Sequence, residues 1–374
     1  MTRKKEVSTQ QRSNILLIAV HAPYNRTKNI DSYFEEFENL VKSNNIPYEH
    51  ILRVKLREID SSTFITRGKL DEIKAYCDEH KIEEVILSES INAKQERNLQ
   101  DHLDCTIFDR THLILEIFEK AAHSAEGKLQ VQIALLKHKK TRLAGKGILM
   151  SQQGGGIGQR GGYGETAKEK ETRVLDNYLL KIKRELKQLQ SHRDTQRKRR
   201  LISGLPLICL IGYTNVGKST ILNMITKSNV LAEDKLFATL DTTTRELYIN
   251  SKKIGLLSDT VGFIQQLPHN LIEAFKSTLS ELKYADLLLH VVDSADPNWQ
   301  EHIEVVHSIL KQLSIDSPML YVFNKIDKLA EAELVDLDFL ASKYRPHVAI
   351  STLTKEGTQP LLDYIEQFNS YKAE

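Results

Sequence analysis

The chain is short of cysteine, tryptophan and proline, with three, one and eight among its 374 residues. Cys77, Cys105 and Cys209 are odd in number and lie far apart, so they offer neither a disulfide framework nor a metal-ligand pattern. No apolar run approaches the roughly 18 residues that a membrane-spanning helix needs. The apolar run at 15–20 is too short for a signal peptide and is typical of a strand. We therefore expect a cytoplasmic protein with no membrane span.

Net charge is also small, because 52 basic and 50 acidic residues leave only +2. This total conceals a separation along the chain. Residues 120–204 hold 20 Lys and Arg against 7 Asp and Glu, an excess of +13, whereas the remainder carries 32 against 43, or −11. A separation of this size indicates a partner for the basic segment and argues against an enzyme that meets only small molecules.

Short apolar runs alternate with helical patterns at both ends of the chain, which predicts α/β domains. We expect a small N-terminal α/β domain over residues 1–115 and a larger, doubly wound α/β domain over residues 204–374. The strands expected in the first are 15–20, 48–54, 84–88 and 105–108. Those expected in the second are 207–211, 247–249, 255–258, 287–292, 319–323 and 348–350.

The middle segment, residues 116–203, has a different, helical pattern. Two apolar stripes predict an antiparallel helical hairpin: Leu129, Ile133, Leu136 and Leu143, then Leu175, Leu179, Ile182, Leu186 and Leu189. The stretch 145–164 between them holds nine of the 17 glycines, which break a helix. Phosphate backbones attract a basic surface of this kind, so we expect contact with RNA, with Arg160 and Tyr163 as candidates. A solvated helix face with a plain glycine turn is the alternative.

The clearest chemical motif is GYTNVGKS, which matches GxxxxGK[ST] between a predicted strand and a predicted helix. In this pattern backbone N–H groups surround a β-phosphate, Lys218 adds positive charge between the β- and γ-phosphates, and Ser219 supplies an oxygen to Mg²⁺. The nucleotide-binding residues expected from it are Gly212, Tyr213, Thr214, Asn215, Val216, Gly217, Lys218 and Ser219.

A second motif follows the strand expected at 255–258 and consists of Asp259, Thr260, Val261 and Gly262. An aspartate at such a strand end can hold Mg²⁺ through water. The Gly262 N–H can meet the γ-phosphate only when a triphosphate is bound, which makes this segment a predicted switch.

A third motif follows the strand expected at 319–323 and consists of Asn324, Lys325, Ile326 and Asp327. A buried Asp327 would accept hydrogen bonds from the N1–H and 2-amino groups of guanine, which adenine does not offer. Asn324 is expected to brace the phosphate loop, and the Lys325 stem to lie over the base. In this order, and each at a strand end, the three motifs predict a GTP site.

A threonine that senses Mg²⁺ and the γ-phosphate should lie between Ser219 and Asp259. The stretch 237–245 offers four candidates, Thr239, Thr242, Thr243 and Thr244, and spacing alone does not choose among them.

These motifs resemble those of the HflX family, ribosome-associated GTPases of the Obg–HflX branch of P-loop GTPases. The resemblance covers about residues 14–370. It rests on GYTNVGKST, FATLD, DTVGF and NKID, on DRTHLILEIF at 109–118, and on KLQVQ followed by GGGIG. It implies a GTPase domain behind an N-terminal α/β domain and a helical arm, with GTP or GDP and Mg²⁺ bound. It also implies binding to the large (50S) ribosomal subunit, through rRNA and proteins, in ribosome splitting, rescue or biogenesis, with GTP hydrolysis controlling release. We expect a monomer.

The resemblance also implies roles for further residues. The FATLD pattern places Phe237, Ala238, Thr239, Leu240 and Asp241 at the nucleotide and makes Thr239 the Mg²⁺-sensing threonine. The guanine-supporting loop is Ser351, Thr352 and Leu353, where the family has an SA-type loop. Catalysis is then expected from Lys218, Thr239 and Gly262, and metal binding from Ser219 and Thr239, with Asp259 acting through water.

Phe263 stands where many GTPases place a water-orienting glutamine. A phenyl ring cannot orient water by hydrogen bonding, so slow intrinsic hydrolysis is expected, with the ordering group supplied elsewhere in the protein or by a partner. A phenylalanine that only packs is the alternative.

Three other functions are compatible with parts of this pattern. A GTPase that aids tRNA modification would carry a C-terminal cysteine, but the last cysteine here is Cys209. A non-ribosomal, GTP-dependent protein-binding switch and a nucleotide-driven RNA remodeller remain alternatives.

Overall fold

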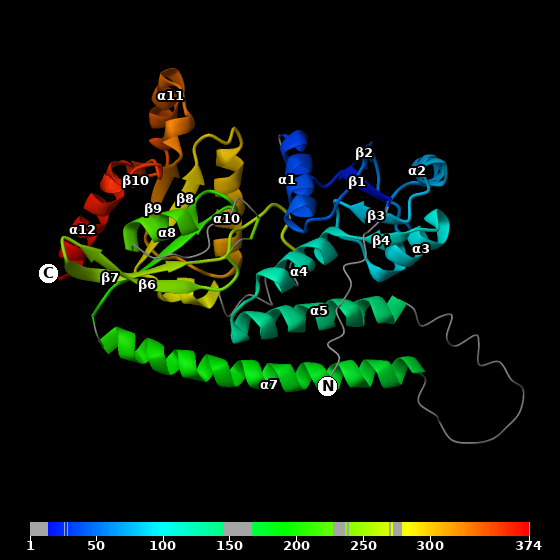
Figure 1. Cartoon of the computed structure of the whole chain (residues 1–374), viewed down its shortest axis with the longest axis horizontal. Helices are drawn as coiled ribbons and strands as arrows, with labels where there is room; N and C mark the ends of the chain where they lie inside the picture. Colours follow the sequence, from blue (N-terminus) through cyan, green and yellow to red (C-terminus); the bar gives the residue numbers. More distant parts are fainter. Residues whose placement is uncertain are drawn as a thin grey trace, which may run out of the picture. The chain divides into compact units, whose positions relative to one another are not determined.

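The computed structural model describes residues 14–25, 27, 29–145, 167–202, 204–226, 236–237, 239–268, 271 and 279–373. The chain divides into two compact units, Met1–Glu116 with Lys137–Leu175 and Ile117–Leu136 with Asp176–Glu374. Figure 1 labels helices and strands of both units where there is room. Each unit includes part of the basic segment, and the domain boundaries expected at residues 115 and 203 stay predictions.

The first unit is built on a four-stranded parallel sheet with the strand order β2-β1-β3-β4. Its strands are β1 (Ile15–His21), β2 (His50–Lys55), β3 (Glu84–Leu87) and β4 (Thr106–Phe108). Helices α1 (Ile30–Ser43), α2 (Arg67–His80) and α3 (Ala93–Leu103) connect them. One core cluster joins Leu16 and Ile18 of β1 to Ile73 of α2 and Leu99 of α3. The small α/β domain predicted from alternating apolar runs is confirmed.

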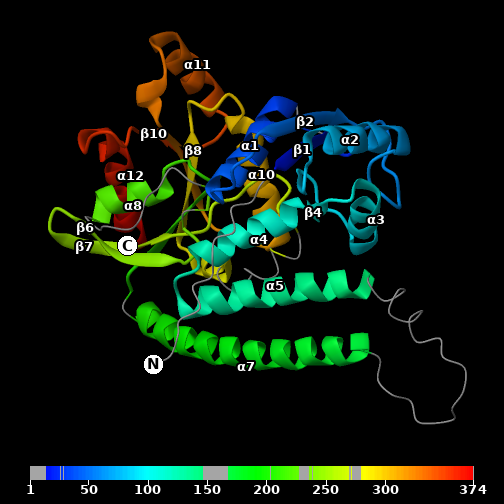
Figure 2. The ribbon, with the colours of Figure 1, turned by 45° about the vertical axis from the view of Figure 1, so that its right-hand side comes forward.

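Helices α4 (Arg110–Ala121), α5 (Ala125–Gly145) and α7 (Ala167–Ile202) follow, and α5 and α7 lie side by side in Figure 2. Ile133, Leu179 and Ile182 form a buried cluster, against which Leu129, Leu136 and Leu186 pack. These are residues of the two predicted stripes, so the hairpin is confirmed for this part. Most of the glycine-rich stretch, including Arg160 and Tyr163, lies outside the described residues.

The second unit contains a six-stranded sheet with the order β10-β9-β8-β5-β7-β6. Its strands are β5 (Leu207–Gly212), β6 (Thr243–Ile249), β7 (Lys252–Asp259), β8 (Leu287–Asp293), β9 (Met319–Asn324) and β10 (His347–Ala349). Its principal helices are α8 (Lys218–Thr226), α10 (Trp299–Gln312), α11 (Glu331–Ala341) and α12 (Gln359–Ala373). Every pair of strands is parallel except β6 with β7, which forms an antiparallel edge. The predicted doubly wound domain is confirmed.

Parallel pairing brings the three sequence motifs to one edge of this sheet. Strand β5 ends at Gly212, β7 at Asp259 and β9 at Asn324. Since the carboxyl ends of parallel strands lie at the same edge, residues far apart in the sequence meet there.

Within the described part of the chain, no helix is long and apolar enough to cross a membrane.

Candidate nucleotide-binding site

The loop from Gly212 to Lys218 turns sharply between β5 and α8. Gly212 has φ +146° and Gly217 has φ +98°, backbone conformations that residues with a Cβ rarely adopt. A Cβ on Gly212 would also collide with the carbonyl oxygen of Val291, and one on Gly217 with the side-chain amide of Asn324. Both glycines of the motif are therefore required by local geometry, and α8 begins where the loop ends.

Lys218 is buried beneath this loop. Its ammonium donates hydrogen bonds to the carbonyl oxygens of Tyr213, at 2.6 Å, and Gly212, at 3.3 Å. Burial lowers the pKa of Lys218 to about 8, and the nearby Asp259 carboxylate opposes that shift. A positive group thus lies beside the N-terminus of α8, where an anion is favoured.

Side-chain oxygens of three residues converge next to Lys218. Ser219 Oγ lies 2.8 Å from Thr239 Oγ1 and donates a hydrogen bond to Asp259 Oδ2 at 2.6 Å. Asp259 is fully buried, and its Oδ1 has no hydrogen-bond partner among the described residues. Burial raises the pKa of Asp259, and the charge of Lys218 opposes this. Hydroxyl and carboxylate oxygens are ligands that suit Mg²⁺, so the donor set and the unpaired oxygen fit that ion.

The structure shows where three of the four candidate threonines lie. Thr239 contacts Ser219, whereas Thr243 and Thr244 lie in β6, where the Thr244 hydroxyl bonds to Ser258. The role of Thr239 at the metal stays a prediction. Sequence spacing left this choice open because all four lie within six residues of one another.

The segment after β7 is joined to the phosphate loop by its backbone. The Phe263 N–H donates to the Gly212 carbonyl at 3.1 Å, and the Thr214 N–H donates to the Phe263 carbonyl at 2.8 Å. The Phe263 side chain is only 1% exposed. Gly262 lies against the loop, since a Cβ there would approach Thr214 and the Lys218 ammonium to 3.0 Å or less. The burial of Phe263 favours the packing interpretation of this residue.

Tyr213 adds a link that its position in the motif did not predict. Its hydroxyl accepts a hydrogen bond from the Gln265 N–H at 2.8 Å, and its ring stacks on His302 of α10 with centroids 3.8 Å apart. The phosphate loop is thereby joined to the helix after β8 as well as to the segment after β7.

Asn324 and Lys325 both reach the phosphate loop. Asn324 is fully buried, and its amide donates to the Val216 carbonyl at 2.9 Å, which is the expected bracing contact. The Lys325 ammonium donates to the Asn215 carbonyl at 2.9 Å and forms an ion pair with Asp293 at 2.7 Å. Asp293, at the end of β8, had not been found from the sequence because it belongs to no motif.

The predicted base-recognition residues meet in one place. Asp327 is exposed, so the burial assumed for it from the sequence is wrong, and it accepts a hydrogen bond from the Ser351 hydroxyl. That hydroxyl in turn accepts from the Leu353 N–H at 3.3 Å, so the loop 351–353 is folded toward the aspartate. Asp327, Ser351 and Leu353 therefore lie together, and their contact with guanine stays a prediction.

The FATLD stretch is anchored on both sides of Thr239. Phe237 and Leu240 are buried, and Ala238 lies outside the described residues. The Asp241 carboxylate accepts hydrogen bonds from the backbone N–H groups of His123 and Ser124. The sequence placed Asp241 with the nucleotide, but its carboxylate is bonded to the residues that precede α5.

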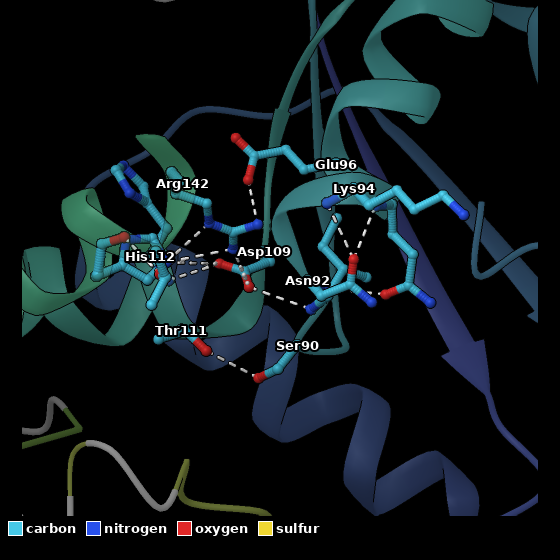
Figure 3. A network of polar contacts seen from close by, with 12 residues as sticks. Ser90, Asn92, Lys94, Glu96, Asp109, Thr111, His112 and Arg142 are labelled. Carbon is cyan, nitrogen blue, oxygen red and sulfur yellow. Dashed lines mark hydrogen bonds and ion pairs between the residues drawn. The ribbon is translucent and has the colours of Figure 1, made fainter. Parts of the chain in front are cut away.

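A separate polar network lies in the first unit (Figure 3). Arg142 of α5 pairs with Asp109 at 2.7 Å and with Glu96. Asp109 also accepts from the N–H of Ile91 and from that of His112. Part of the basic charge of the middle segment is therefore neutralised inside this unit.

Comparisons with known proteins cover nearly the whole chain. Residues 31–119 match a family model described as GTP-binding GTPase N-terminal, 121–200 one described as GTP-binding GTPase Middle Region, and 207–325 one described as 50S ribosome-binding GTPase. The chain is 45% identical to GTPase HflX of Caldanaerobacter subterraneus over 85% of this chain and 72% of that protein. It is 39% identical to GTPase HflX of Alkalihalophilus pseudofirmus over 96% and 84% of the two chains. A GTP-binding protein from Sulfolobus solfataricus in complex with GDP aligns at 24% identity and a TM-score of 0.47, over 96% of this chain and 100% of that one.

Proposed function

The chain belongs to the HflX family of GTPases and hydrolyses GTP, and we propose that it does so with Mg²⁺ and binds the large (50S) ribosomal subunit. In this proposal the triphosphate-bound form is the one that binds the subunit, in ribosome splitting, rescue or biogenesis, and hydrolysis controls release. The observation that carries the ribosomal part is the match of residues 207–325 to a 50S ribosome-binding GTPase model in a chain whose residues 120–204 carry an excess of +13.

The proposed chemistry is transfer of the γ-phosphoryl group to water. Lys218 exchanges its two loop carbonyls for phosphate oxygens and neutralises charge that develops there. The convergence of Ser219, Thr239 and Asp259 supports a Mg²⁺ site, with Asp259 acting through water. When bound, the ion supplies further charge neutralisation. The Gly262 N–H is the proposed contact of the γ-phosphate.

Base selection is assigned to Asp327, with Asn324 and Lys325 holding the loop between the base and the phosphates. The bonds from Asn324 to Val216 and from Lys325 to Asn215 support this, because they join the base-recognition motif to the phosphate loop. Ser351, Thr352 and Leu353 are proposed to support the guanine edge.

The arm helices are the proposed surface for rRNA. Several basic side chains of α7 are exposed, namely Lys170, Arg173, Lys181, Lys183, Arg184 and Lys187. A cationic surface attracts phosphate backbones without sequence preference, and its affinity falls steeply with salt. We assign the three-part organisation accordingly, with residues 116–203 as the arm between an N-terminal domain and the GTPase domain.

The test is sedimentation of the full chain with purified large subunits in GDP or in a non-hydrolysable GTP analogue. We expect comigration in the analogue, weaker comigration in GDP, and loss of comigration when residues 145–164 are deleted. A second deletion, removing the last turns of α12, is the control for a shortened chain. Equal comigration with GDP and with the GTP analogue contradicts nucleotide-dependent binding to the subunit. No comigration with GDP and none with the analogue favours a non-ribosomal protein-binding role.

A further inference from the structure

The start of helix α5 is bonded to a residue of the FATLD stretch. Asp241 accepts the backbone N–H groups of His123 at 2.9 Å and Ser124 at 2.6 Å, and also the Ser124 hydroxyl. The same hydroxyl accepts from the Gly127 N–H at 2.9 Å. The first N–H groups of a helix have no partner within the helix, so Asp241 and Ser124 together cap α5. All these residues belong to the second unit.

Asp241 and the first turn of α5 lie in direct contact at Gly127. A Cβ on Gly127 would collide with Asp241 Oδ1 and would lie 3.1 Å from Ser124 Oγ. Gly127 is in the first turn of α5, where a glycine otherwise weakens a helix relative to alanine. The absence of a side chain at this position is therefore required by the contact with Asp241 and by no demand of the helix itself.

On the other side of Thr239, Phe237 is fixed in a similar way. Its ring meets the ring of Phe118 of α4 edge-on, with centroids 4.7 Å apart and planes at 77°. Leu240, between Thr239 and Asp241, is also buried. Thr239 is thus held between an aromatic contact to α4 and a charged contact to the start of α5, while its own hydroxyl points to Ser219.

From this arrangement we infer that Asp241 is a positioning residue for GTP hydrolysis, which holds Thr239 at the metal site by binding the start of α5. Order in the stretch 237–241 and capping of α5 are then one linked equilibrium. Linkage is reciprocal, so a partner that stabilises the start of α5 raises the affinity for GTP with Mg²⁺, and triphosphate binding stabilises the start of α5. The inference rests on the proposed function of Thr239 as a Mg²⁺ ligand.

Two variants break the contact from opposite sides. Asp241→Ala removes the acceptor. Gly127→Ala displaces the carboxylate by collision but places a better helix former in α5, so a role limited to helix stability predicts no loss for it. Asp241→Asn keeps one oxygen that accepts N–H groups and is the conservative variant. Asp338→Ala, which removes an exposed carboxylate from α11, is the matched control.

The measurement is GTP hydrolysis by the full-length protein as a function of Mg²⁺ concentration, with GDP affinity measured in parallel. Hydrogen bonds to a charged group are each worth enough to shift an equilibrium about tenfold. We expect Asp241→Ala and Gly127→Ala to raise the Mg²⁺ concentration for half-maximal hydrolysis by about tenfold. Asp241→Asn should recover part of the loss, and Asp338→Ala should match the wild type. GDP affinity should change by less than about twofold, because Thr239 is assigned to the triphosphate-bound state alone.

Hydrogen exchange supplies the second measurement. In the wild type, the amides of residues 123–127 should exchange more slowly with a GTP analogue and Mg²⁺ than with GDP, and this difference should vanish in Asp241→Ala. A wild-type Mg²⁺ response in Asp241→Ala or in Gly127→Ala overturns the inference. Thr239→Ala tests the role of Thr239 as a Mg²⁺ ligand separately from the role of Asp241. A wild-type Mg²⁺ response in Thr239→Ala contradicts the assignment of Thr239, on which the inference about Asp241 rests.

Discussion

Ser219 Oγ and Thr239 Oγ1 lie 2.8 Å apart, although one residue begins α8 and the other lies in the stretch before β6. Both hydroxyls adjoin Asp259, whose second carboxylate oxygen has no hydrogen-bond partner among the described residues. The three side chains come from three separate motifs, so their meeting is a property of the folded sheet. It turns a set of sequence patterns into a defined donor set.

Replacing Thr239 by alanine tests that donor set directly. Thr239→Ala removes one proposed metal ligand and should lower the turnover number for GTP by at least about tenfold, because a bound metal ion contributes several kcal/mol to transition-state stabilisation and this variant weakens its binding. Thr243→Ala is the matched control, since Thr243 was an equal candidate in sequence but lies in β6. Steady-state phosphate release measures both. If Thr243→Ala shows the larger loss, the assignment of the threonine is wrong.

In the proposed function, the choice of nucleotide depends on the exposed carboxylate of Asp327. Asp327→Asn replaces an acceptor of two N–H groups by an amide that cannot accept both, so GTP affinity should fall by at least about a hundredfold. Xanthosine triphosphate, which presents an oxygen where guanine has the 2-amino group, should bind the variant better than GTP. Asp336→Asn, at an exposed position of α11, is the control. Competition between labelled GTP and unlabelled nucleotides gives both affinities, and unchanged GTP preference would contradict the role of Asp327.

Local patterns predicted most of the frame of this site. Alternating apolar runs located the strands, and motifs at the ends of parallel strands had to meet at one edge, as Asn324 and the phosphate loop do. The bonds from Asp241 to Ser124 and from Lys325 to Asp293 were not predicted. Each contact joins residues that only tertiary packing brings together. In addition, any residue type other than proline can offer a backbone N–H to a carboxylate, so the partner of Asp241 cannot be recognised from its residue type. Thr239 is an intermediate case. The sequence predicted that a threonine would sense Mg²⁺, but the choice among four threonines needed the structure or the family pattern.

Phe263 offers a test of what orients the attacking water. Its side chain is 1% exposed and its backbone is bonded to Gly212 and Thr214, so a glutamine placed there would be buried. Phe263→Gln should not accelerate hydrolysis, and it should lower the free energy of unfolding by about 2 kcal/mol or more, since a buried amide loses its bonds to water. Phe263→Leu, the apolar control, should cost less. A tenfold faster single-turnover rate in Phe263→Gln would show instead that the residue can face the nucleotide.

The buried His290 in the middle of β8 predicts how stability depends on pH. Burial lowers its pKa to about 3, and the neighbouring His307 and Lys218 act in the same direction. The folded state therefore holds His290 neutral, whereas the unfolded chain takes up a proton near the ordinary histidine pKa of about 6.5. Because the unfolded state binds more protons between these two values, stability is full above about pH 6.5 and is lost as pH falls toward 3.

Between pH 7.5 and pH 5.5 this one group should remove about 1 kcal/mol from the free energy of unfolding. His290→Phe cannot take up the proton and should reduce the pH dependence by that amount, whatever its effect on absolute stability. Urea unfolding followed by the fluorescence of Trp299 measures it, because Trp299 is the chain's one tryptophan and packs against Phe323 of the same unit. Equal pH dependence in the variant and the wild type would mean that His290 is already accessible to protons in the folded protein.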